Sequence, residues 1–408
     1  MNKNILTETV KKHLQVLCEQ IGERRVGSAE NRRATDYAQK VLSDLGWETT
    51  ATELSVIDWS TGGAALTCGN QSFEVFSSHY ALGCRAKGEL LAIDTIGRLE
   101  QTDMTDKIIL LHGEIAAEQI APKKFPFWNP QEHQHLISVL EKGKPLALVT
   151  ATSRNAALAG GVYPFPLFED GDFDIPSVFM KDTEGEKLLA CSGKTVELTS
   201  LAKRIPETAY NVIARKGDAA KNKIVVTAHI DTKINTPGAI DNATGVAIVL
   251  ALAEIWKNYS HPIPLELVFF NGEDYYGAPG QVKYTEQNAG KFNKILLNIN
   301  IDGAGYQEGL SCFSAFNLPP TIATALQNVL SNTPAIAEGL PWYQGDHSLF
   351  LQNGCAAIAV SSQWFIENME TQELTHTPQD NLSIVNPERV AECVAGIAEL
   401  VEAIATGS

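Results

Sequence analysis

The sequence predicts an α/β fold with a mostly parallel central sheet flanked by helices and a smaller β-rich domain inserted into the chain. Short apolar runs at residues 211–214, 224–228, 265–270 and 295–301 alternate with stretches of helical periodicity. This alternation is typical of strands that helices join into a parallel sheet. Between residues 58 and 205 the sequence changes to short β-prone runs separated by turns, which indicates a second domain.

Helical patterns open and close the chain. Apolar residues recur at helical spacing over residues 5–22, and Ser28 is placed to cap a second helix that ends near Gly46. Residues 387–404 begin with a proline and carry an apolar stripe, so we expect a last helix there. These helices can cover the predicted sheet.

The insertion follows a strand-like segment at residues 47–56. Within it, residues 107–112 and 146–152 are predicted strands, and residues 130–142 have the pattern of a helix between them. The predicted domains are a discontinuous domain of residues 1–57 and 206–408, and an inserted domain of residues 58–205.

The composition indicates a folded globular protein. The chain has 408 residues, of which 44% are apolar and 20% charged. A net charge of −16 argues against a nucleic-acid partner, which would require clustered Lys and Arg. The first residues have scattered charges and no unbroken apolar core, so we expect no signal peptide, no membrane span and no membrane partner. Seven cysteines without a CxxC motif suit reduced thiols, and we expect a cytoplasmic protein.

Polar side chains follow the predicted strand at residues 224–228. His229 and Asp231 come directly after it, and Asp241 lies just beyond a Pro-Gly turn and before a predicted helix at residues 243–256. In open α/β sheets ligands bind at the carboxyl ends of the strands. One imidazole and two carboxylates are therefore expected at that edge.

Three further polar clusters occur at positions that this edge would share. Glu273 and Asp274 follow the predicted strand at residues 265–270, Asp302 follows the next strand, and His376 stands in a polar loop. Two histidines with several carboxylates and no cysteine suit zinc or a similar divalent metal. Two metals about 3.5–4 Å apart would need a carboxylate that bridges them.

These segments resemble the co-catalytic dizinc aminopeptidases of metallopeptidase family M28. The resemblance rests on motifs that occur in the order of the family: RRVGSAENRRATDYA (24–38), AHIDT (228–232), PGAIDNATGVA (237–247), FFNGED (269–274), NIDG (300–303) and HTPQDN (376–381). It covers residues 1–57 and 206–408, and residues 58–205 resemble the protease-associated domain that many members carry as an insertion.

The resemblance implies a role for each ligand. His229 and Asp302 would hold one zinc ion, Asp274 and His376 the second, and Asp241 would bridge the two. Glu273 would be the general base that accepts a proton from the metal-activated water, which attacks a peptide bond. Asp231 would orient His229 through its other ring nitrogen, and Asp380 would do the same for His376. Asp274 stands where the family usually has Glu, so either the strand end must come closer to the metal or the second metal site is looser.

The residues leave several functions open. A zinc-dependent aminopeptidase that removes N-terminal residues from peptides is the leading hypothesis. The alternatives are a carboxypeptidase or N-acyl amino acid deacylase with the same metals, a glutaminyl-cyclase-like enzyme with one metal, and a catalytically silent receptor or scaffold. His347 and Tyr343 are candidate substrate-binding residues, although His347 could equally be a helix residue and Tyr343 part of the core. The inserted domain would either roof the mouth of the active site or form the contact of a homo-oligomer.

Overall fold

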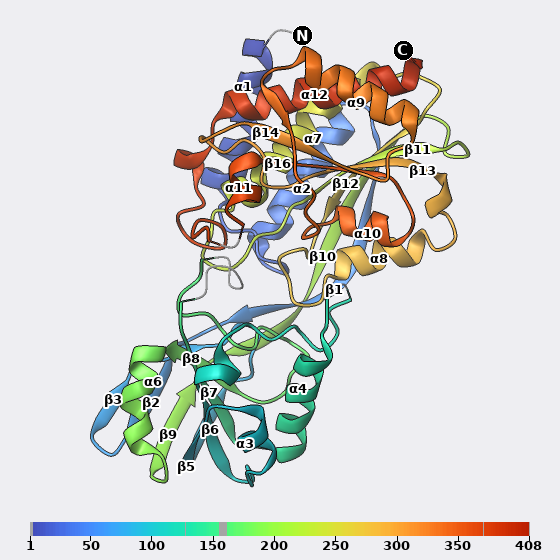
Figure 1. The fold of residues 1–408 in the computed structure, drawn as a ribbon. Helices are drawn as coiled ribbons and strands as arrows, with labels where there is room; N and C mark the ends of the chain where they lie inside the picture. The colour runs from blue at the N-terminus through green and yellow to red at the C-terminus, as the bar shows by residue number, and fades with distance from the viewer. Residues whose placement is uncertain (1–2, 127, 155–160, 370, 408) are drawn as a thin grey trace. The chain divides into compact units, whose positions relative to one another are not determined.

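A computed structural model describes residues 3–126, 128–154, 161–369 and 371–407 (Figure 1). The chain divides into two compact units. The first consists of Met1–Val56 and Thr208–Ser408, and the second of Ile57–Glu207. The sequence had placed the insertion at residues 58–205.

The first unit contains a sheet of eight strands in the order β1-β10-β12-β11-β13-β16-β14-β15. The strands are β1 (Glu48–Ser60), β10 (Lys203–Lys216), β11 (Lys223–His229), β12 (Leu265–Phe270), β13 (Ile295–Ile301), β14 (Ser311–Phe316), β15 (Ile336–Glu338) and β16 (Ala357–Ser362). The four central strands β12, β11, β13 and β16 are parallel. The prediction of an α/β fold is confirmed, and the predicted parallel arrangement is found in these four central strands.

Two strands beside the centre run in the opposite direction. β10 pairs antiparallel with β12, and β14 pairs antiparallel with β16. Residues 217–222 link β10 to β11, and residues 302–310 link β13 to β14. A parallel strand needs a crossover of a dozen or more residues, so links this short reverse the chain. The expectation of a mostly parallel sheet did not include these reversals.

Helices cover both faces of this sheet (Figure 1). α1 (Lys3–Gln15), α7 (Thr244–Ile255), α9 (Pro320–Asn332) and α12 (Pro387–Thr406) gather on one face, and α8 (Pro279–Gln287) and α10 (His347–Gln352) lie on the other. α2 (Ala29–Asp44) contacts α7, and α11 (Gln363–Glu367) contacts β16. As predicted, Ser28 caps α2, because its hydroxyl accepts a hydrogen bond from the Asn31 amide.

The helical stretch Ala239–Asn258 is long and apolar enough to cross a membrane by composition. However, 83% of its apolar window is buried inside the protein. A helix that is apolar on all sides is either a membrane span or a core helix. Here its residues belong to the main hydrophobic core, together with α1, α12 and the central strands.

The second unit contains a sheet in the order β3-β2-β9-β5-β6-β7-β8-β4. Its strands are β2 (Ala64–Cys68), β3 (Gln71–Phe73), β4 (Phe76–Ser77), β5 (Cys84–Ile93), β6 (Lys107–Leu111), β7 (Ala147–Thr152), β8 (Ser177–Lys181) and β9 (Thr195–Ser200). Its helices include α3 (Ile96–Glu100), α4 (Gln131–Gly143) and α6 (Asp182–Leu188). The strands β5 to β8 are parallel, and apolar clusters on the two faces form its cores. This unit is β-rich with few helices, as the sequence indicated.

Candidate metal centre

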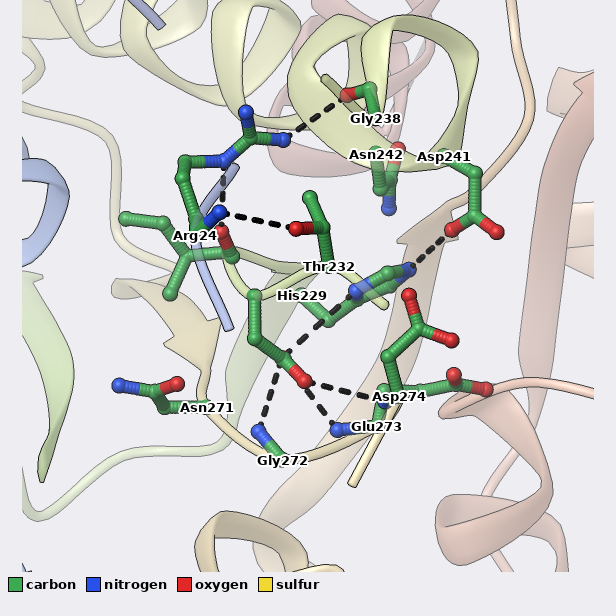
Figure 2. Close-up of polar contacts among 12 residues, drawn as sticks. Arg24, His229, Thr232, Gly238, Asp241, Asn242, Asn271, Gly272, Glu273 and Asp274 are labelled. Carbon is green, nitrogen blue, oxygen red and sulfur yellow. Dashed lines mark hydrogen bonds and ion pairs between the residues drawn. The ribbon is translucent and has the colours of Figure 1, made fainter. Parts of the chain in front are cut away.

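The parallel strands β11, β12 and β13 carry the candidate residues at one edge of the sheet. His229 is the last residue of β11 and pairs in register with Phe270, the last residue of β12. Because parallel neighbours end at the same edge, the loop after β12 brings Glu273 and Asp274 beside His229. Figure 2 shows these side chains together.

Asp241 lies between two pairs of candidate ligands. One of its oxygens, Oδ1, is 3.0 Å from Nε2 of His229, which is 3.5 Å from Oδ1 of Asp302. The other oxygen, Oδ2, is 3.2 Å from Nε2 of His376, which is 3.1 Å from Oδ1 of Asp274. The structure thus brings all five sequence-predicted ligands together, with one carboxylate shared by two histidine–carboxylate pairs. Asp274 reaches His376 despite being shorter than Glu.

The donor atoms fit divalent metal ions. Tetrahedral ligands about 2.1 Å from a zinc ion lie about 3.4 Å apart, which is close to the separations within each pair. Both ring nitrogens of His229 and Oδ2 of Asp274 are buried, and none makes a well-directed hydrogen bond to the described residues. Buried polar atoms normally have a partner. A metal ion in each pair would provide one for Nε2 of His229 and for Oδ2 of Asp274.

Asp231 holds the loop that carries Glu273. Its two carboxylate oxygens accept hydrogen bonds from three consecutive backbone amides, those of Gly272 at 2.8 Å, Glu273 at 3.3 Å and Asp274 at 3.0 Å. Its Oδ1 lies 3.7 Å from Nδ1 of His229, beyond a normal hydrogen bond. The sequence interpretation gave Asp231 only the contact with His229. The structure adds the amides, and these are the closer contacts.

Asp380 holds the backbone beside Asp241. Its carboxylate accepts hydrogen bonds from the amides of Ile240 at 2.7 Å and Asp241 at 3.1 Å. The expected contact was with His376, four residues earlier. The structure instead gives Asp380 the task of fixing the residue that two ligand pairs share.

Glu273 is surrounded by acidic groups. Burial raises its pKa well above the usual value, the carboxylates of Asp274, Asp302 and Asp346 raise it further, and His229 opposes them. A carboxylate with a raised pKa is suited to accept and return a proton near neutral pH. Glu273 belongs to neither histidine–carboxylate pair, so its carboxyl group is available for proton transfer.

Comparison with known proteins agrees with this geometry. The sequence model of peptidase family M28 matches residues 211–401, which include every one of the five candidate ligands and Glu273. The matched region, residues 211–401, belongs to peptidase family M28. The peptidase family that the motifs indicated is therefore confirmed for this region.

Curated relatives of this chain are distant. A probable leucine aminopeptidase 2 from Aspergillus oryzae is 24% identical over 87% of the chain and 64% of its own length. A probable lipoprotein aminopeptidase from Mycobacterium tuberculosis is 25% identical over 74% of the chain and 60% of its own length. The chain therefore spans less than two thirds of the length of either relative.

Solved structures share the fold of this chain. An aminopeptidase from Aneurinibacillus sp. strain AM-1 superposes with a TM-score of 0.74, covering 97% of this chain and 93% of that one at 20% identity. A zinc aminopeptidase from Bacillus subtilis gives a TM-score of 0.73, covering 98% and 94% at 17% identity. Both similarities extend over nearly the full length, and they show the fold.

The two candidate substrate residues have different environments. His347 is fully buried, and its ring packs against Phe316 and Trp342, whose carbonyl lies 2.8 Å from Nε2. Tyr343 is 66% exposed. His347 therefore lies in an apolar cluster, and Tyr343 is the one of the two that solvent reaches.

Asp346 was missed in the sequence, although it stands next to His347. It is buried, its Oδ1 accepts a hydrogen bond from Nε2 of Gln281 at 2.8 Å, and burial raises its pKa to about 7. Its other oxygen has no hydrogen-bond partner in the described part of the chain. The only available signal was the position of an acid beside a candidate histidine. That signal does not distinguish a site residue from a helix cap.

We expect the metal-free protein to lose stability as the pH rises from about 5 to about 8. Despite burial, neighbouring carboxylates raise the pKa of His229 and of His376 well above the usual value, and burial raises the pKa of Asp346 and of Asp380 to about 7. A raised folded-state pKa means that the folded chain binds more protons than the unfolded chain. The stabilisation that each such group contributes is fully present below its pKa in the unfolded chain. It is lost as the pH rises through the pKa of that group in the folded chain.

Thermal melting in a chelator across this range tests the expectation. The fall of the melting temperature with pH should be shallower in Asp346→Asn and Asp380→Asn, because the asparagine side chain does not titrate. Zinc should also reduce this fall of the melting temperature, since bound metal replaces the protons on the ligands. A melting temperature that rises with pH in the metal-free protein would contradict the assignment.

Proposed function

We propose that this chain is a zinc-dependent aminopeptidase that hydrolyses the peptide bond following a free N-terminal residue. The observation that carries the proposal is the position of Asp241 between two histidine–carboxylate pairs, with Glu273 next to one of them. The relatives named as aminopeptidases support the same activity.

We assign each residue of the site a separate role in hydrolysis. Two zinc ions bound here would activate water, polarise the scissile carbonyl and offset developing negative charge. His229 and Asp302 would hold one ion, Asp274 and His376 would hold the other, and Asp241 would contribute to both. The Glu273 carboxylate accepts the proton of the attacking water and delivers it to the departing amine. Asp231 keeps Glu273 in place by binding the amides of its loop.

The acidic side chains at the site that do not belong to the ligand set favour a substrate with a free amine. Two divalent ions would offset the charges of the three ligand carboxylates, leaving Glu273 and Asp346 as acids outside the ligand set. A protonated α-amino group is attracted to such a site, whereas the C-terminal carboxylate recognised by a carboxypeptidase is repelled. An N-acyl substrate of a deacylase has no amine to bind there.

A glutaminyl-cyclase-like enzyme and a silent scaffold differ from the proposed enzyme in metal content and in site residues. The cyclase-like enzyme would hold one tightly bound zinc ion per chain, whereas an aminopeptidase with this site requires two. A silent scaffold would need to have lost a ligand or the base, whereas the described residues retain all of them.

The proposal is tested with the purified, zinc-loaded protein and a panel of aminoacyl p-nitroanilides. We expect release from substrates with a free amine and at least about 100-fold slower release from their N-acetylated counterparts, since the buried acids would lose their partner. Peptides with an amidated C-terminus should be cleaved as well as free ones. Hydrolysis only of N-acetylated substrates, or only of peptides with a free C-terminus, would replace this proposal with a deacylase or a carboxypeptidase.

The second unit and the location of the protein are part of the same proposal. We assign residues 58–205 to a protease-associated-like domain because of the resemblance of that segment. A cytoplasmic location is supported by the seven cysteines, all of which are free thiols in the structure. A homo-oligomer remains a proposal that solution scattering of the full chain would test.

A further inference from the structure

Arg24 is a buried cation in the first unit that the mechanism does not use. It lies between α2 and the π-helical turn η1 (Val16–Ile21) that follows α1, and its relative exposure is 0%. Its guanidinium donates hydrogen bonds to backbone carbonyl oxygens: Nε to Ile230 at 3.0 Å, Nη1 to Leu17 at 3.2 Å, Gly22 at 2.9 Å and Pro237 at 2.8 Å, and Nη2 to Gly238 at 2.8 Å.

Burying this charge is costly, because an ion taken out of water must recover its lost hydration from protein groups. A guanidinium has five N–H donors in a rigid planar fork, and here backbone carbonyls surround that fork. The acids that act on Arg24 through longer-range attraction include Asp380, Asp231 and Asp241. Because the buried Arg24 guanidinium donates to these carbonyls, it fixes the geometry of the backbone around it.

The backbone that Arg24 fixes is the loop between two metal ligands. Ile230 follows His229 directly, and Pro237 and Gly238 come shortly before Asp241. The backbone amide of Arg24 also donates to the hydroxyl of Thr232 at 2.9 Å. Figure 2 shows Arg24 bonded to Thr232 and Gly238 beside the facing side chains of His229 and Asp241.

Residues 230–238 contain no helix or strand, so side-chain contacts must set their conformation. Gly238 has a φ of 56°, and a Cβ there would lie 2.2 Å from Cγ2 of Thr232 and 3.1 Å from Nη2 of Arg24. Glu23, the residue before Arg24, accepts a hydrogen bond from the Asn235 amide at 2.7 Å. The segment around Arg24 therefore holds this loop along most of its length.

The same segment reaches the loop after β12. The side-chain amide of Asn31 donates to the carbonyl of Arg24 at 2.8 Å, and Asn31 and Asn271 exchange two side-chain hydrogen bonds of 2.9 Å each. Asn271 directly precedes the Gly272–Asp274 backbone that Asp231 binds. Two loops that carry ligands and the base are thus joined through one N-terminal segment.

We infer that Arg24 is a positioning residue of the metal centre: its guanidinium ties Ile230 to Gly238 and so holds His229 and Asp241 at ligand distance. The inference rests on the proposed function, because it requires that these residues bind metal. Arg24 touches neither the ligand side chains nor a substrate, and it acts only through the loop.

The test compares Arg24→Ala with Arg33→Ala, a control on α2 that removes an exposed arginine. Zinc affinity is measured by competition with a chelator, a readout independent of catalysis. We expect Arg24→Ala to lose about 10–100-fold in zinc affinity, the range found when residues outside the ligand set are removed. Arg33→Ala should bind zinc like the wild type.

Guanidinium ion separates positioning from general destabilisation. Millimolar guanidinium, far below denaturing concentrations, should restore zinc binding to Arg24→Ala by occupying the vacated space, and equal sodium chloride should not. If Arg24→Ala does not fold, Arg24→Lys keeps the charge with at most three donors, and it should fold with reduced zinc affinity. Wild-type zinc affinity in the folded variant, or a loss that guanidinium does not reverse, would overturn the inference. Wild-type protein that binds zinc without hydrolysing peptides would overturn the proposed function alone.

Discussion

Replacing Glu273 with glutamine is expected to lower kcat for a free-amine peptide by about 10²–10⁴-fold, the usual contribution of a general acid–base group. Glutamine keeps the size of the side chain but cannot accept the proton of the attacking water. Because Glu273 stands outside both histidine–carboxylate pairs, the zinc content should remain at two ions per chain. The loss should therefore appear in kcat and not in metal binding.

Steady-state kinetics and a metal count on the same preparation test this expectation. Glu308→Gln is a matched control, since Glu308 is an exposed glutamate on the loop after β13. It should leave both quantities unchanged. A Glu273→Gln enzyme with wild-type kcat would remove Glu273 from the mechanism, and one that had lost zinc would make Glu273 a ligand.

Replacing Asp241 with alanine should affect both metal ions at once. Its two oxygens lie 3.0 Å from His229 and 3.2 Å from His376, so the substitution removes one ligand from each pair. We expect zinc affinity to fall by more than about 100-fold, beyond the range for residues outside the ligand set. Hydrolysis should fall below detection at ordinary zinc concentrations.

Dialysis against defined zinc concentrations followed by elemental analysis measures this effect. Asp36→Ala is the control, because Asp36 is an exposed aspartate of α2. Asp380→Asn should give an intermediate loss, since the Asp380 side chain contacts the backbone amides of Ile240 and Asp241 and not the metal ligands' side chains. Retention of two tightly bound ions by Asp241→Ala would show that Asp241 does not bridge them.

The central strands could be predicted from the sequence for a physical reason. A parallel strand covered on both faces is apolar throughout its length, and β11, β12 and β13 appear as such runs that end abruptly in polar residues. The position of His229, Asp274 and Asp302 at those ends followed from this pattern. Their grouping around Asp241 was implied by the resemblance to the family, and the structure has the geometry that such a grouping needs.

Some features depend on contacts that a linear pattern does not contain. The reversal of β10 and β14 depends on the lengths of two links, which were visible only once the strand limits were known. Arg24 and Arg25 are adjacent and chemically identical, yet Arg24 is fully buried and Arg25 is half-buried. Their difference arises because the fold places the carbonyls of residues 230–238 around one of them. Asp231 likewise binds amides of another loop.

Anomalous diffraction at the zinc absorption edge from crystals of the zinc-loaded protein tests the central claim most directly. We predict two peaks per chain about 3.5–4 Å apart, with Asp241 between them, one beside His229 and Asp302 and the other beside Asp274 and His376. A single peak, or two peaks that do not share Asp241, would contradict the account.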